Sequence, residues 1–133
     1  MPTATVSLSR PCPPRDRAGR LPRLRAQVEA LTLARLVCEA TLGFPLTHAE
    51  VGAHLRRAAV AVPVHIADAC ACAVRVERER RLAAAWDRLV DLAGCLDLAA
   101  DVGLIPADRA AELARHCRWA SRLVHVLAHG PMR

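Results

Sequence analysis

Apolar residues recur at every third or fourth position in four segments of this chain, and prolines and glycines separate the segments. In the last segment the repeating positions are Leu113, Cys117, Ala120, Val124 and Leu127. This spacing matches an α-helix with one buried face, which has about 3.6 residues per turn. Alanine, leucine and arginine outnumber the β-branched and aromatic residues that favour sheets. The sequence therefore predicts an all-α protein.

Glycines and prolines give the predicted bounds of three of the four helices. The first runs from residue 24 to Gly43, a glycine expected to end it in a left-handed conformation. The third runs from Arg75 to Gly103 with Trp86 on its core face, and the fourth runs from about residue 106 to 130. The core face of the first helix is predicted to consist of Leu24, Val28, Leu31, Cys38 and Leu42, widened by Leu33, Leu36 and Val37.

The second helix has both a start signal and an expected interruption. Thr47 and Glu50 have the spacing of a capping box, which predicts that the helix begins there and runs to about Ala73. Pro63 lies inside it. Because proline lacks an amide hydrogen and clashes with the preceding turn, we expect a kink or a short break at this point.

Four helices joined by short turns predict an antiparallel, up-down-up-down four-helix bundle at residues 23–130. The alanine-rich helix faces also predict close approach between helices. Residues 1–22 contain five prolines among Ser, Thr and Arg. Such a composition cannot bury enough apolar surface to offset the entropy of ordering, so these residues are predicted to be a disordered arm.

The positive charge is concentrated near the N-terminus. Residues 1–25 hold six arginines and one aspartate, a net charge of +5, whereas the remaining thirteen arginines and twelve acidic residues leave +1. A nearly neutral body does not predict attraction of nucleic acid or anionic membrane over its whole surface. Every basic residue other than histidine is arginine. This suits phosphate recognition, but GC-rich coding is the simpler explanation, so the arginine content alone does not indicate a nucleic-acid partner.

The sequence predicts a cytoplasmic protein that does not enter a membrane. No segment approaches the roughly 20 apolar residues that span a bilayer. The N-terminus lacks the apolar region of a signal peptide, because prolines and an arginine occupy the place where it would lie. The six cysteines are then expected to be reduced thiols.

Two pairs of potential metal ligands have unsuitable surroundings. Cys70 and Cys72 are two residues apart, which places them on different sides of a helix, and no second cysteine pair has zinc-site spacing. His125 and His129 share a helical face, but no carboxylate has the spacing found in helical metal sites. We interpret the histidine pair as solvated or as facing phosphate.

Acidic pairs offer the remaining candidate for chemistry. Asp87 with Asp91, and Asp97 with Asp101, are one helical turn apart and could hold a cation, but a solvated flank is the simpler interpretation. The chain has no glycine-rich phosphate loop and no nucleophile at a suitable spacing from a base. We therefore expect no enzymatic activity, no cofactor and no bound metal.

The best candidate for a functional surface is a basic stripe on the fourth helix. Its residues advance by three or four positions and are Arg115, Arg118, Arg122, His125 and His129. Guanidinium groups on one face match the phosphates of a nucleic-acid backbone, although the solvated side of an amphipathic helix has the same pattern. Trp119 is the only aromatic residue interleaved with the stripe, so sequence-specific recognition of single strands is not expected.

Residues 55–69, with the sequence LRRAAVAVPVHIADA, resemble a motif of a bacterial family of four-helix bundle proteins. The family is encoded in intervening sequences of large-subunit rRNA genes, and its motif is approximately L-R-R-A-A-x-S-I-P-x-N-I-A-E-G. Weaker similarity follows at residues 93–98 and 102–105, and the resemblance covers about residues 27–128. The usual Ser, Asn, Glu and Gly of the motif are here Ala61, His65, Asp68 and Ala69.

This resemblance implies a homopentamer. One branch of the family, the accessory variability determinant (Avd) of diversity-generating retroelements, binds nucleic acid and a reverse transcriptase and is not an enzyme. The resemblance thus predicts a non-catalytic accessory protein that binds RNA or DNA through the basic stripe. Further phosphate contacts are expected from Arg56, Arg57, Arg15, Arg17 and Arg20. The alternative is a protein–protein scaffold that does not bind nucleic acid.

Overall fold

The computed structural model describes residues 17–130, and side chains from residue 20 onward. The described residues form four α-helices, α2 (Arg17–Thr41), α3 (Ala49–Ala71), α4 (Arg75–Asp101) and α5 (Ala107–His129). A short 3-10 helix, η1 (Leu46–His48), precedes α3. No strand occurs among the described residues. The prediction of an all-helical bundle is confirmed.

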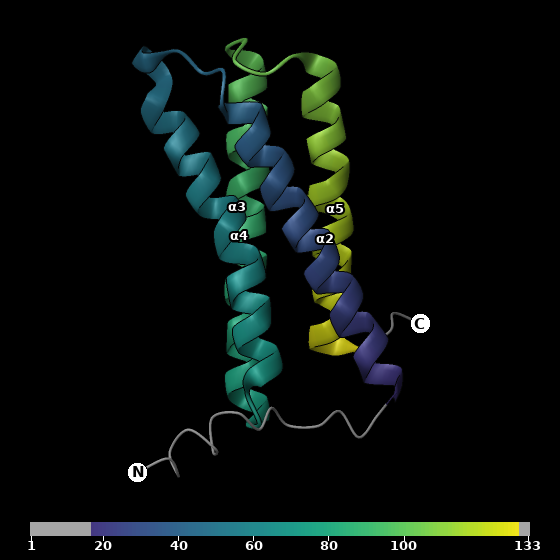
Figure 1. Cartoon of the computed structure of the whole chain (residues 1–133). Coiled ribbons are helices and arrows are strands. Elements are labelled where there is room, and N and C mark those ends of the chain that lie inside the picture. The colour runs from purple at the N-terminus through teal and green to yellow at the C-terminus, as the bar shows by residue number, and fades with distance from the viewer. Residues whose placement is uncertain (1–16, 131–133) are drawn as a thin grey trace, which may run out of the picture.

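The four helices occupy the corners of a square. Packing contacts join α2 to α3, α3 to α4, α4 to α5, and α5 back to α2, so α3 and α5 lie on one diagonal. Figure 1 shows the α2–α3 and α4–α5 connections at one end of the molecule and the α3–α4 connection at the other. Side chains on opposite corners therefore face different sides of the bundle.

One apolar core runs along the inside of this square. Each leucine, isoleucine or valine that is fully buried there stabilises the fold by about 1.5–3 kcal/mol relative to an exposed side chain. Alanines on all four helices, among them Ala30, Ala59, Ala85 and Ala120, are also buried and let the helix backbones approach closely. The largest fully buried side chains are Leu33, Leu55, Ile66, Leu89, Leu92, Leu96, Leu113, Val37, Val62 and Val124.

The predicted core face of the first helix is only partly correct, because Leu33, Leu36 and Val37 are buried as expected but other members are not. Leu24, Val28 and Leu31 are 58%, 54% and 53% exposed. Leu42 lies beyond the end of the helix and is also exposed. A second stripe with equally helical spacing faces the core instead, and it consists of Ala26, Ala30, Leu33 and Val37. Because α2 carries two apolar stripes, periodicity alone does not determine which is buried, and the stripe with small residues allows the closer packing.

The boundary between arm and bundle also differs from the prediction. Helix α2 begins at Arg17, so residues 17–22, which were assigned to the arm, are helical. Pro22 lies within α2, where it removes one backbone hydrogen bond near the helix start without ending the helix. The rest of the predicted arm, residues 1–16, lies outside the described residues.

The predicted capping box at the start of the second helix does not form. Residues Leu46–His48 form η1 instead, in which the backbone amide of His48 donates a hydrogen bond of 2.9 Å to the carbonyl oxygen of Pro45. The hydroxyl of Thr47 lies 3.1 Å from Nδ1 of His48 and caps no amide. Gly43 does not adopt the expected left-handed conformation, whereas Gly103 and Gly130 do, with φ values of +81° and +79°.

Helix α3 passes through Pro63 without a break. The helix is continuous from Ala49 to Ala71, and Figure 1 shows its axis changing direction about midway along its length. Pro63 is buried, and its carbonyl oxygen accepts a hydrogen bond of 3.2 Å from Nε2 of Gln27 on α2. The bend thus lies in the α2–α3 contact.

Further polar contacts connect helices that are neighbours in the square. On the α2–α5 side, Nδ1 of His116 lies 2.6 Å from a carboxylate oxygen of Glu29. On the α3–α4 side, the guanidinium of Arg81 lies 3.3 Å from the carboxylate of Asp68. The Glu29 side chain is only 16% exposed, so its carboxylate depends on this partner more than a solvated carboxylate would.

We predict that His116→Ala lowers the free energy of unfolding by about 1–3 kcal/mol, because it leaves the Glu29 carboxylate without its partner. Urea denaturation followed by circular dichroism measures the change. Arg35→Ala is the matched control, since Arg35 pairs with Glu39 on the surface of α2 and its loss costs at most about 1 kcal/mol. Equal effects of the two substitutions would contradict a structural role for the His116–Glu29 pair.

Candidate nucleic-acid interface

The basic stripe predicted on the fourth helix lies on the outer side of α5. Arg115, Arg118, Arg122 and His129 are exposed, and His125 is half-buried. Among the residues that the structure describes, no carboxylate forms an ion pair with any of the three arginines. Their guanidinium groups are therefore available to an external anion.

A groove of about 680 Å³ runs along the α4–α5 boundary beside this stripe. Arg118, Arg122 and His125 line it from α5, while Trp86 and Val90 line it from α4. Cations and apolar surface thus share one groove. A carboxylate also lines the groove, that of Asp97.

The sequence predicted that Trp86 lies in the core, but its side chain is partly exposed. Its side chain is 40% exposed, while Leu82, Ala85 and Leu89 on the same helix are buried. Trp86 stands at the edge of this buried face, where its ring reaches over α5. The ring centroid lies 6.2 Å from that of His125, which in turn lies 4.7 Å from that of His129. These three rings form an aromatic surface next to the arginines.

A second exposed tryptophan borders the stripe on its other side. Trp119 is 45% exposed and lines a hollow of about 380 Å³ together with Leu24 and Val28 of α2. It follows Arg115 by one helical turn and precedes Arg122 by about the same distance. The arginines of α5 are therefore flanked by an indole on the α4 side and by another on the α2 side.

The phosphates and the bases of a nucleic acid bind different kinds of side chain, and this surface has both kinds. Guanidinium groups donate hydrogen bonds to phosphate oxygens in a forked geometry, and indole rings stack on unpaired bases. The arrangement of both types on one helix face suits a single strand better than a duplex, whose bases are already stacked. Sequence reasoning identified the cations but missed Trp86, because its spacing from the core leucines made it part of the apolar face.

Of the other arginines predicted to contact phosphate, Arg56 and Arg57 do not join this surface. Arg56 and Arg57 lie on α3, the diagonal opposite of α5. Arg56 also has an internal partner, since its Nη1 donates to Oγ1 of Thr41 at 3.0 Å. Arg20 is exposed on α2, Arg17 is helical in its backbone, and Arg15 lies outside the described residues.

The predicted solvated flank on α4 has a more specific environment than expected. Asp91 contacts His54 of α3 at 3.1 Å and the Sγ atom of Cys95 at 3.8 Å. Burial, with a further contribution from Asp91, raises the pKa of the Cys95 thiol above its ordinary value. Within the described part of the chain, His54, Asp91 and Cys95 are the three potential metal ligands that lie close together. Neither the cysteine pair near residue 70 nor the histidine pair of α5 belongs to such a group.

No protein-family model matches this chain, and a search of curated proteins found no similar sequence. The resemblance to the rRNA intervening-sequence family therefore stays a prediction that rests on the motif around Pro63. None of the described helices is long and apolar enough to cross a membrane.

Proposed function

We propose that this protein is a non-catalytic accessory protein that binds single-stranded RNA or DNA along α5. The observation that carries the proposal is the set of three exposed arginines without carboxylate partners, bordered by two exposed tryptophans. Arg115, Arg118 and Arg122 contact phosphates, and Trp86 and Trp119 stack on bases. His125 and His129 extend the polar surface towards the end of the helix.

Binding of this kind is electrostatic and depends on salt. A protein that neutralises phosphates releases their counterions, so its affinity falls as the salt concentration rises. The carboxylate of Asp97 in the α4–α5 groove confines favourable contact to the arginine side of that groove. Three arginines give modest affinity in one chain, and several copies in an assembly raise it through multivalency.

A second copy of the chain is the partner that the exposed face of α2 suits. Leu21, Leu24, Val28 and Leu31 form an apolar stripe along this helix, and each is more than half exposed. Val60 and Val64 add exposed apolar surface on the neighbouring helix α3. Exposed apolar side chains repeated along one helix face are typical of an interface. We propose that it joins antiparallel, up-down-up-down bundles into the homopentamer that the family resemblance implies.

The same resemblance suggests the biological setting. We propose that the protein acts as an Avd-like partner of a reverse transcriptase in a diversity-generating retroelement and has no catalytic role of its own. A reverse transcriptase gene and a template repeat beside its gene would support this setting. Location within an rRNA intervening sequence would contradict the setting without affecting the proposed nucleic-acid binding.

A protein–protein scaffold is the second candidate function. The exposed apolar surface of α2 and α3 favours it, because this surface suits a different protein as well as a second copy. In a scaffold the arginines of α5 only maintain solubility. The two functions differ in their response to salt, since apolar docking does not weaken as the salt concentration rises.

We predict that the double substitution of Arg118 and Arg122 by Ala weakens binding of a fluorescent single-stranded RNA by at least about tenfold at low salt, because charge-assisted hydrogen bonds are lost. The slope of log K against log salt should decrease by about one for each phosphate contact removed. Trp119→Ala should weaken binding by about 1–3 kcal/mol without changing that slope. Fluorescence anisotropy measures both quantities.

The control for this experiment removes the same charge elsewhere. Arg35 and Arg75 are exposed but form ion pairs with Glu39 and Glu79, each at 3.0 Å, so their joint replacement by Ala should have little effect on RNA binding. An equal loss in this control would mean that binding reflects overall charge only. Failure of the unmodified protein to bind RNA or DNA at low salt would refute the proposed function.

We predict that the protein self-associates and that Val28→Arg or Leu31→Arg dissociates the assembly, because a charge buried in an apolar interface costs several kcal/mol. Sedimentation velocity measures the change in mass. Leu98→Arg is a matched control, since Leu98 is 57% exposed on α4, the helix diagonally opposite α2. A monomeric unmodified protein, or dissociation by the control substitution alone, would contradict this assignment of the interface.

A further inference from the structure

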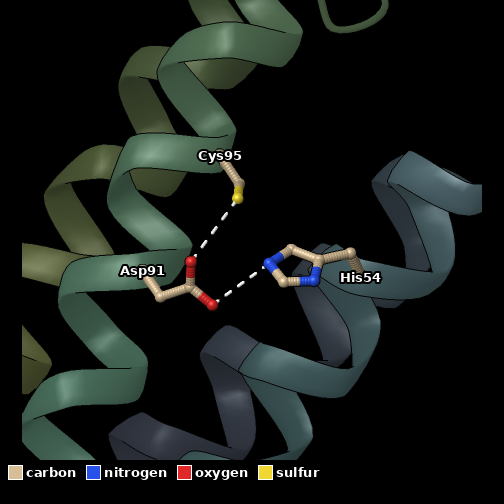
Figure 2. A group of neighbouring side chains, drawn as sticks. All are labelled: His54, Asp91 and Cys95. Carbon is tan, nitrogen blue, oxygen red and sulfur yellow. Dashed lines mark hydrogen bonds and ion pairs between the residues drawn. The ribbon is translucent and has the colours of Figure 1, made fainter.

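Three side chains with different donor atoms meet between α3 and α4. Figure 2 shows His54 of α3 pointing towards Asp91 and Cys95, which lie one turn apart on α4. Nε2 of His54 lies 3.1 Å from Oδ2 of Asp91, and Sγ of Cys95 lies 3.8 Å from Oδ1 of the same carboxylate. One ligand atom from each residue lies within 4.8 Å of the other two.

These separations are close to those around a tetrahedral zinc ion. Zinc binds histidine nitrogen and carboxylate oxygen at about 2.0–2.2 Å and thiolate sulfur at about 2.3 Å, so ligand atoms in a tetrahedron lie about 3.3–3.6 Å apart. The observed nitrogen–oxygen and sulfur–oxygen distances lie on either side of this range, although they end on different oxygens of Asp91. One donor atom from each residue lies within 4.8 Å of the others, so the side chains must move closer together to share one ion.

We propose that His54, Asp91 and Cys95 bind a Zn²⁺ ion, with solvent at the fourth position. The ligand set is the reason for choosing zinc, because calcium and magnesium take oxygen ligands and seldom a thiolate. The spacing of Asp91 and Cys95 places both on one face of α4, and His54 supplies the third ligand from another helix.

The location of the site gives the ion access and a structural effect. The side chains of His54 and Asp91 are 46% and 36% exposed, so an ion reaches them from solvent. Because the ligands come from two helices, the ion binds the folded chain more tightly than the unfolded chain and stabilises the contact between α3 and α4. The site lies away from the α5 stripe and does not depend on the proposed nucleic-acid binding.

Titration with Co²⁺ tests the proposal, since cobalt replaces zinc in tetrahedral sites and absorbs light. The full chain, without a histidine tag and kept reduced, is titrated with Co²⁺ and then with Zn²⁺. We expect a thiolate-to-cobalt charge-transfer band and the visible bands of tetrahedral cobalt, both removed by added zinc. Absence of the charge-transfer band in the unmodified protein would overturn the proposal.

Substitutions then show which residues bind the ion. Cys95→Ser should abolish the charge-transfer band, whereas Cys72→Ser, which changes a thiol outside the cluster, should retain it. A band that persists in Cys95→Ser places the ion at another cysteine and rejects the site. Circular dichroism confirms that each variant is folded, and Cys95→Ala, which also removes the thiol, gives the same test if Cys95→Ser does not fold.

Zinc affinity provides a second readout. Competition with a chromogenic chelator measures zinc affinity. Removal of an outer-shell partner of a metal ligand lowers metal affinity by roughly 10- to 100-fold, so His54→Gln and Asp91→Asn, which remove ligands themselves, should lower zinc affinity by at least this factor. Asp87→Asn is the matched control, because Asp87 lies one turn before Asp91 on α4 and outside the cluster. Zinc should raise the thermal unfolding midpoint of the unmodified protein and of this control. Equal zinc affinity in all four proteins would refute the proposal.

Discussion

Close packing of alanine-lined helix faces around one core is the constraint on which the rest of this structure depends. Ala30, Ala59, Ala85 and Ala120 contribute little apolar area each, but they allow the larger leucines and isoleucines of neighbouring helices to interdigitate. Once these faces are turned inward, the orientation of every other residue around each helix is fixed. The arginines of α5 and the leucine stripe of α2 are exposed for this reason.

The outward surfaces therefore differ from one side of the bundle to another. The α5 side has cations flanked by indole rings, the α2 side has a continuous apolar stripe, and the α3–α4 boundary holds the cluster of His54, Asp91 and Cys95. A nearly neutral body is compatible with phosphate binding because the three arginines of the stripe have no carboxylate partners. The apolar stripe of α2 borders Trp119, which shares a hollow with Leu24 and Val28, so a second copy bound to this stripe competes with a base for Trp119.

The sequence predicted the elements of the fold better than their orientation. In α5, apolar and charged residues occupy clearly separate sides, so the buried Leu113 and the exposed Arg118 were both placed correctly. In α2, two apolar stripes have the same period, and tertiary packing chooses between them. Trp86 stands at the edge of a core face, where a helical wheel does not give its exposure. The contact of His54 with Asp91 joins distant parts of the chain, so no local spacing reveals it.

The central claim is that α5 is the surface that meets nucleic acid. Photocrosslinking of a single-stranded RNA containing photoreactive bases, followed by mass spectrometry of the linked peptides, tests it most directly. We expect crosslinks at Trp86 and Trp119 and in peptides containing Arg115, Arg118 or Arg122. Crosslinks confined to α3, around Arg56 and Arg57, would contradict this claim.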